Sequence, residues 1–115
     1  MPRDVMAEIK NEVATNKVII YMKGSPSFPM CGFSARTVEV LRATGRPFAH
    51  VNILEDAEKR EAIKVYSNWP TLPQVYIDGE LVGGCDIVEE LAASGELAQL
   101  LGRAFGRDAA TSATT

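Results

Sequence analysis

Along the first third of the chain the hydrophobic residues first recur at the spacing of a helix and then form a continuous run typical of a buried strand. Apolar residues at helical spacing predict an amphipathic helix over 4–15, and the β-branched run "KVIIYM" (17–22) predicts a strand buried on both faces. The loop 23–30 holds a glycine and two prolines, which interrupt regular structure. A second helix is expected over 32–44, because apolar residues again recur at helical spacing until a glycine and a proline follow.

The middle of the chain predicts a strand, a helix and a hairpin. "FAHVNI" (48–53) is expected to form a strand, and residues 56–67 a helix. In "QVYIDGELVGG" (74–84) two short apolar runs flank Asp78-Gly79, a residue pair that suits a two-residue hairpin turn. We therefore expect a local antiparallel pair of strands here.

The order of these elements predicts how the sheet is built. Two consecutive strands joined by a helix run parallel, with a right-handed crossover, whereas a hairpin adds antiparallel strands. The sequence thus predicts an α/β fold: a mixed four-stranded sheet, a parallel βαβ unit plus an antiparallel hairpin, with helices on both faces. Two short helices around 86–94 and 96–105 complete one domain over 1–107, and the tail 108–115 is expected to be disordered.

Composition narrows the class of protein. The 115 residues are 46% hydrophobic with a formal net charge of −3, which suits one globular domain without the basic surface that nucleic acid requires. No apolar run approaches the roughly 20 residues that cross a bilayer, and the N-terminus lacks the apolar core of a secretion signal. We expect a cytoplasmic protein that binds neither nucleic acid nor membrane. In a reducing compartment each of its two cysteines is either buried filler or part of the chemistry.

The stretch "KGSPSFPMCGFSART" (23–37) gives the first cysteine a chemical role. Cys31 follows a polar, kinked loop and begins a helix at the carboxyl end of a strand, where open α/β sheets bind ligands. A helix N-terminus stabilises a thiolate, so Cys31 is expected to have a lowered pKa and to act as a nucleophile or metal ligand. A buried, inert cysteine is the alternative, which the polar loop disfavours. Ser34 stands where a two-cysteine redox motif would carry its second thiol, and His50, the only histidine, lies away from the motif.

Three strings, at their spacings in this chain, resemble the monothiol glutaredoxins, a branch of the thioredoxin fold: "YMKGSP", "CGFS" and "WPTLPQVYIDGELVGGCD". The resemblance covers about residues 4–105 and implies a thioredoxin-like three-layer fold. Dithiol relatives keep a second cysteine three positions after the first. In them a much shorter run separates the lysine from the first cysteine. This chain has Ser34 and seven residues between Lys23 and Cys31, and both features favour the monothiol branch.

The family binds glutathione, and the resemblance implies which residues hold it. Lys23 and Arg60 would bind the glycine carboxylate, although each on its own could be a solvated surface charge. Pro73 resembles the family's cis-proline. Such a proline would expose the backbone of Leu72, next to Thr71, to pair with the cysteine of glutathione like an added strand.

The string "GGCD" (83–86) would close the glutathione site. The helix expected from about Asp86 offers its N–H groups to the γ-glutamyl carboxylate, and Gly84 lets the chain turn tightly before it. Asp86 is expected to cap this helix and to accept a hydrogen bond from the ligand ammonium. Cys85 would contribute its backbone, while its thiol is either inert, which we favour, or able to trap Cys31 in a disulfide. Trp69 is either a wall of the pocket or a packing residue.

Two functions remain open. In the first, which Ser34 favours, Cys31 and the thiol of glutathione from each of two protomers supply the four ligands of a [2Fe–2S] cluster. The protein would then carry clusters, with a second copy of itself as partner and Cys31 as its metal ligand. In the second, the protein is an oxidoreductase that reduces protein–glutathione mixed disulfides with Cys31 alone. The resemblance also implies client iron–sulfur apoproteins and a BolA-like protein as partners.

Overall fold

A mixed four-stranded sheet forms the centre of the computed structural model, which describes residues 2–114 and the side chains of 2–106. The strand order is β4-β1-β5-β6. β1 (Val18–Met22) pairs in parallel with β4 (Ala49–Asn52) and antiparallel with β5 (Gln74–Ile77), which pairs antiparallel with β6 (Glu80–Gly83). The sheet predicted from the sequence is confirmed.

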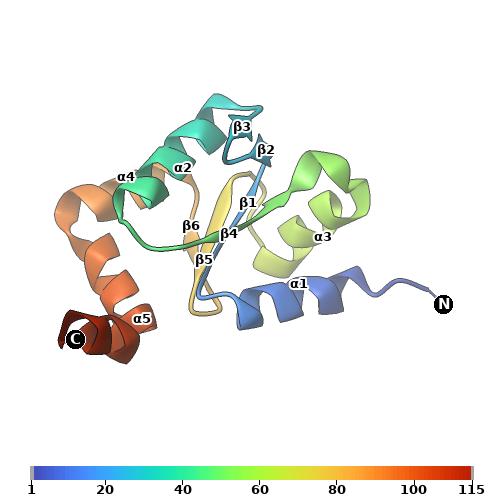
Figure 1. The fold of residues 1–115 in the computed structure, drawn as a ribbon. Coiled ribbons are helices and arrows are strands. Elements are labelled where there is room, and N and C mark those ends of the chain that lie inside the picture. The colour runs from blue at the N-terminus through green and yellow to red at the C-terminus, as the bar shows by residue number, and fades with distance from the viewer. Residues whose placement is uncertain (1, 115) are drawn as a thin grey trace.

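Helices cover both faces of this sheet (Figure 1). α1 (Val5–Thr15) and α3 (Ala57–Ser67) pack on one face. The other face is covered by α2 (Gly32–Ala43), α4 (Cys85–Ser94) and α5 (Glu96–Thr114). None of the helices in the described part of the chain is long and apolar enough to span a bilayer.

The apolar run of β1 divides between two hydrophobic cores. Val18, Ile20 and Met22 belong to the core beneath α2 and α4, whereas Ile19 and Tyr21 belong to the core beneath α1 and α3. Each of these five side chains is at most 3% exposed. Since burying one large apolar side chain contributes about 1.5–3 kcal/mol, β1 is firmly anchored in the sheet. The site is built at its carboxyl end.

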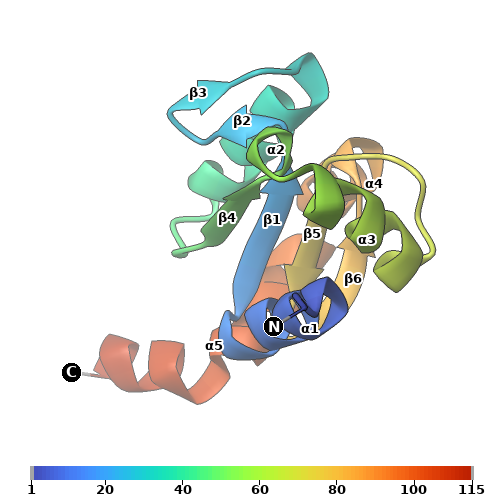
Figure 2. The same ribbon diagram turned by 90° about the vertical axis from the view of Figure 1, so that its right-hand side faces the viewer.

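The loop 23–30 contains regular structure, so the expectation of an irregular loop is wrong. β2 (Gly24–Ser25) and β3 (Phe28–Pro29) form a two-stranded antiparallel ribbon beyond the carboxyl end of β1 (Figure 2). Gly24 permits it: its φ is +93°, and a Cβ at this position would lie 2.5 Å from the backbone oxygen of Phe28. Glycine here makes the turn rather than merely interrupting structure.

Two further element boundaries differ from the prediction. The strand expected over 48–53 ends at Asn52, because the side-chain oxygen of Asn52 accepts the N–H of Leu54 at 3.0 Å and starts a short 3-10 helix, η1 (Ile53–Glu55). The capping role expected for Asp86 is wrong: Gly84 is the N-cap of α4, and Asp86 already lies in its first turn.

The last helix is longer than expected. The sequence predicted a helix around 96–105, whereas α5 runs Glu96–Thr114 with a break at Gly106, where φ is 33° and ψ is −108°. Side chains beyond Gly106 lie outside the described part of the chain. The disorder expected of 108–115 therefore stays a prediction.

Candidate functional site

Cys31 is the N-cap residue of α2, with an extended backbone and a partly exposed side chain. The N–H groups of Ser34 and Phe33, in the first turn of α2, and the hydroxyl of Ser34 stabilise the thiolate form of its sulfur. These groups, led by the Ser34 N–H and joined by the positive charge of Lys23, lower the pKa of the thiol, although partial burial opposes the shift. This direction agrees with the lowered pKa expected from the sequence, and Cys31 is partly exposed rather than buried.

Two side-chain oxygens fix the backbone that leaves β1. Ser34 is fully buried, and its Oγ accepts the N–H of Lys23 at 3.1 Å. Asn52, at the end of β4, accepts the N–H of Gly24 at 2.9 Å. The start of the loop is therefore tied both to the helix that carries Cys31 and to the neighbouring strand. Sequence reasoning valued Ser34 only as a missing thiol and overlooked Asn52.

A cleft of about 550 Å³ opens in front of Cys31, between the start of α2, α3, the loop before β5 and the start of α4. His50 is exposed on β4 and is not among the residues that line the cleft. Every residue that the sequence analysis assigned to a ligand does line it, together with Cys31: Lys23, Arg60, Thr71, Leu72, Pro73, Gly84, Cys85 and Asp86.

Three cations face this cleft. Lys23 follows β1, Arg60 lies in the first half of α3, and Lys64 lies one helical turn after Arg60. Among the residues that the structure describes, Lys23 and Arg60 form no ion pair, and Lys64 meets only the exposed Glu61 at 3.3 Å. Sequence reasoning missed Lys64, although its spacing of four residues from Arg60 is the available signal. The cleft therefore offers positive charge to an anionic ligand.

The loop before β5 forms one wall of the cleft. The Leu72–Pro73 peptide bond is cis, as expected. Within the described residues, no hydrogen bond uses the backbone N–H or carbonyl of Leu72. Trp69 lines the cleft, and its buried indole N–H has no partner among the described residues. Gly84 packs closely on this wall, since a Cβ there would lie 3.2 Å from the Pro73 carbonyl oxygen.

Gln74 holds this wall in place. Its side chain is fully buried, and its amide nitrogen donates to the carbonyls of Trp69 at 3.0 Å and Thr71 at 3.2 Å. Its amide oxygen accepts the hydroxyl of Tyr76 at 3.1 Å. A fully satisfied buried amide specifies one loop conformation, so Gln74 is a supporting residue of the site. A polar residue at the start of an otherwise apolar strand was the signal for it.

The start of α4 completes the cleft. Its N-cap, Gly84, has no side chain to cap the helix, so the first N–H groups of α4 carry no side-chain partner. Cys85 is buried at 6% exposure, while the carboxylate of Asp86 is exposed and lies 3.8 Å from the guanidinium of Arg36. Both cysteines are free thiols. Whether the Cys85 thiol is inert or able to trap Cys31 stays a prediction.

Comparison with known proteins identifies the family. The sequence profile described as Glutaredoxin matches residues 18–82, from β1 into β6. The chain belongs to the glutaredoxin family. This glutaredoxin is 52% identical to Glutaredoxin 4 of Escherichia coli over 94 residues, which cover 82% of each chain. It is 54% identical to a probable monothiol glutaredoxin 2 of Rickettsia conorii over 93 residues, 81% of this chain and 87% of the relative.

A solved structure supports the same assignment. The structure of reduced apo GrxS14 from poplar superposes on this glutaredoxin with a TM-score of 0.77 at 46% identity. The match covers 86% of this chain and 91% of the poplar protein. The thioredoxin-like fold and the resemblance to monothiol glutaredoxins, both predicted from the sequence, are confirmed.

Proposed function

We propose that this glutaredoxin binds glutathione in the cleft and carries a [2Fe–2S] cluster, bridged between two protomers, for transfer to iron–sulfur apoproteins. The observation that carries this proposal is the set of thiols. One protomer presents a single partly exposed thiol of lowered pKa, Cys31, while Ser34 occupies the second motif position and Cys85 is buried. A [2Fe–2S] cluster takes four ligands, so the other three come from outside the protomer. The thiol of bound glutathione and a second protomer with its own glutathione supply them.

The shape and charge of the cleft support glutathione as that external ligand. Its glycine carboxylate suits Lys23 and Arg60, with Lys64 adjacent, because charge-assisted hydrogen bonds to carboxylates are the strong ones. Its cysteine residue would pair with the free backbone of Leu72, next to Thr71 and the cis Pro73, as an added strand.

The γ-glutamyl end of glutathione suits the start of α4. Its carboxylate would accept the N–H groups of the first turn, after Gly84 and at Cys85, which a side chain leaves uncapped. Its ammonium would donate to Asp86, whose carboxylate is exposed. This arrangement would direct the thiol of glutathione toward Cys31, between the two ends of the ligand.

Exposed apolar residues around Cys31 support contact with a second protein. Phe28 is 71% exposed, Met30 57% and Phe33 53%, and all three lie within three residues of Cys31. Apolar side chains grouped at one edge of a polar surface are typical of interaction sites. A second copy of this chain, a BolA-like protein sharing the cluster, or a client apoprotein would cover them. A cytoplasmic location, whose reducing conditions would keep Cys31 from being oxidised, suits this activity.

The lowered pKa of Cys31 also favours a second candidate function, reduction of protein–glutathione mixed disulfides. The Cys31 thiolate would attack the glutathione sulfur, releasing the protein thiolate and forming a Cys31–glutathione disulfide. A second glutathione thiolate would attack the glutathione sulfur of that disulfide, which releases oxidised glutathione and restores Cys31. The same cleft would hold the glutathione in both functions.

Reconstitution without oxygen tests the proposal. The wild type, Cys31→Ser and Cys85→Ser are each given iron, sulfide and glutathione, and visible absorbance and bound iron and sulfide are measured. We expect a cluster in the wild type and Cys85→Ser and none in Cys31→Ser. Loss of the cluster in Cys85→Ser would reassign the ligand. A colourless wild type that rapidly turns over mixed disulfides would favour the second function.

A further inference from the structure

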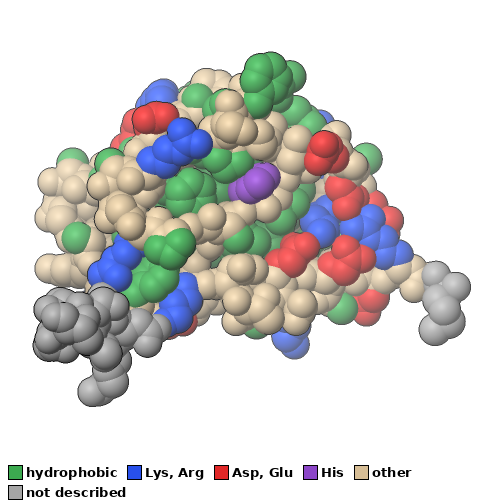
Figure 3. All heavy atoms as spheres, in the orientation of Figure 1, with side chains coloured by type: hydrophobic (Ala, Val, Ile, Leu, Met, Phe, Trp, Pro, Cys, Tyr) green, Lys and Arg blue, Asp and Glu red, His purple; other side chains and the backbone are tan. Residues whose placement is uncertain are grey.

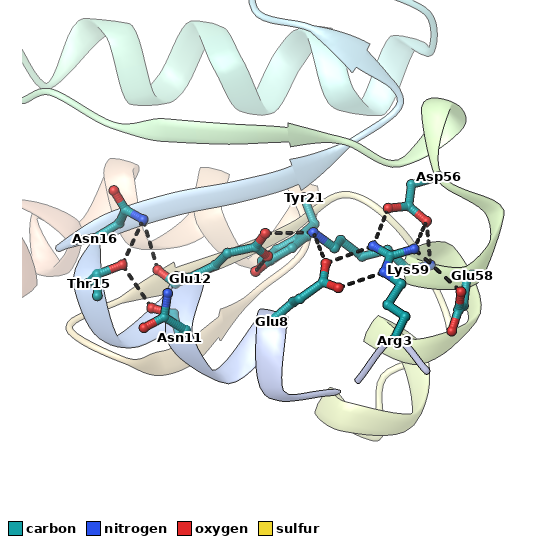
Figure 4. Close-up of polar contacts among 10 residues, drawn as sticks. All are labelled: Arg3, Glu8, Asn11, Glu12, Thr15, Asn16, Tyr21, Asp56, Glu58 and Lys59. Carbon is teal, nitrogen blue, oxygen red and sulfur yellow. Dashed lines mark hydrogen bonds and ion pairs between the residues drawn. The ribbon is translucent and has the colours of Figure 1, made fainter. Parts of the chain in front are cut away.

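A network of ion pairs joins the N-terminal segment to α1 and to the start of α3 (Figure 4). The guanidinium of Arg3 contacts Glu8 at 2.6 and 2.7 Å and Asp56 at 2.6 and 3.0 Å, and it reaches Glu58 at 3.4 Å. In Figure 3 acidic and basic side chains gather where α1 and α3 meet, near the N-terminus. We call Arg3, Glu8, Glu12, Asp56 and Lys59 the α1–α3 ion cluster.

Lys59 extends this cluster into the interior. Its side chain is only 9% exposed, and its ammonium lies 2.6 Å from Glu12 and 3.4 Å from Glu8. Glu12 also accepts the hydroxyl of Tyr21, in β1, at 2.7 Å. A nearly buried charge is retained only with close partners, so Lys59 is directed at α1.

Asp56 links the cluster to the first turn of α3. Its carboxylate caps the helix by accepting the N–H of Lys59 at 3.0 Å, and its carbonyl accepts the N–H of Arg60 at 2.9 Å. Arg3 binds both oxygens of the same carboxylate. The beginning of α3 is therefore held at a defined place relative to α1.

The orientation of Lys59 determines that of Arg60. Successive helical residues point about 100° apart, so a helix whose Lys59 faces α1 turns its next residue, Arg60, away from α1. Arg60 lines the cleft, and so does Lys64 one turn later. Apolar residues of both helices, among them Ile9 and Ile63, also belong to one hydrophobic core, but hydrophobic contact is not directional. The ion cluster supplies the directional contacts.

We propose that Arg3 and Lys59 are positioning residues for Arg60, because the α1–α3 ion cluster fixes the rotation of α3 and thereby the place of the guanidinium in the cleft. This inference rests on the proposed glutathione binding. Under this inference Arg3 and Lys59, which do not line the cleft, affect the affinity of the cleft for the glycine carboxylate of glutathione.

Fluorescence of Trp69, the only tryptophan and a residue of the cleft wall, can report binding. Arg3→Gln, Lys59→Met and Arg60→Gln are compared in a Cys31→Ser protein, titrated with glutathione and with its glycine ethyl ester, which lacks the carboxylate charge. Lys10→Gln, which removes a cation from α1 outside the cluster, is the matched control. Thermal unfolding by circular dichroism confirms that each variant is folded at the temperature of the titration.

We expect Arg3→Gln and Lys59→Met to weaken glutathione binding about three- to tenfold, with ester binding unchanged and no further loss when either is combined with Arg60→Gln. Lys10→Gln should bind like the parent. Full affinity in both cluster variants, with weakened binding in Arg60→Gln, would overturn this inference and leave the proposed function standing. Equal losses for glutathione and ester would also overturn it. A parent protein that does not bind glutathione would overturn both proposals.

Discussion

Replacing Ser34 by alanine tests how far the chemistry of Cys31 depends on one buried hydroxyl. In the folded protein this hydroxyl accepts the N–H of Lys23 at 3.1 Å, and it contributes to the lowered pKa of Cys31. Alanine fits the same space and does neither. The variant therefore removes the hydrogen bond to Lys23 and the hydroxyl that favours the Cys31 thiolate, and it leaves every cation and thiol in place.

The magnitude follows from what is left unpaired. A buried donor without a partner costs about 1–3 kcal/mol, and the N–H of Lys23 is only partly buried, so we expect the free energy of unfolding to fall by about 1 kcal/mol. The pKa of Cys31 should rise above that of the wild type. It should stay below the ordinary 9.0, because the N–H groups of residues 33 and 34 remain.

Two assays separate these effects. The rate of Cys31 alkylation by iodoacetamide across pH reports the thiolate, and urea unfolding reports stability. Thr37→Ala is the matched control, because it removes another fully buried hydroxyl from α2, one bonded at 2.8 Å to the Phe33 carbonyl. We expect it to leave the alkylation profile unchanged. An alkylation profile of Ser34→Ala that coincides with the wild type would refute the assigned role of the hydroxyl.

Three further predictions concern the same region and the ion cluster. Ser34→Cys should raise mixed-disulfide turnover and shorten the lifetime of a bound cluster, since the new thiol competes for Cys31; unchanged turnover in a coupled glutathione reductase assay would contradict this. Gly45→Ala is expected to lower the free energy of unfolding by about 1–2 kcal/mol, because Gly45 has a positive φ. Gly24→Ala should lower it by more, because Gly24 also has a positive φ and its added Cβ would meet backbone atoms. Equal urea midpoints for the two variants would show that the ribbon of β2 and β3 shifts to accommodate the Cβ. Hydrogen bonds from Arg3 hold the pKa of Glu8 and of Asp56 at about 2, so the two ionised carboxylates stabilise the fold fully above their ordinary pKa values of 4.5 and 3.8, and this stabilisation is lost as the pH falls toward 2. In Arg3→Gln the free energy of unfolding should therefore fall less steeply than in the wild type between pH 4.5 and pH 2. An unchanged slope would contradict this prediction.

Much of the fold could be predicted because its signals are local. The β1 run is apolar at every position because the strand is buried on both faces, and Asp78-Gly79 makes its turn with its own backbone, with φ of 54° and 83°. The residues of the cleft could be predicted because the family strings carry their spacing. Their convergence on one cleft agrees with that prediction.

The contacts that tie distant segments together could not be predicted, because they join residues far apart in the sequence. Asn52 accepts the N–H of Gly24 across 28 positions, and the Arg3–Asp56 pair spans 53. The cap of α4 was misplaced for a different reason. Both Gly84 and Asp86 are residue types that cap helices, and only the extended backbone of Gly84, with φ −96° and ψ −162°, decides between them.

The shared-ligand cluster is the central claim, and one measurement tests it most directly. Size-exclusion chromatography with absorbance detection, run across a glutathione titration, reports the oligomeric state and the bound cluster together. The account predicts a monomer without cluster, a coloured dimer with cluster and glutathione, and a return to colourless monomer as glutathione is removed. A coloured dimer that persists without glutathione would contradict it, because the protein would then supply all four ligands itself.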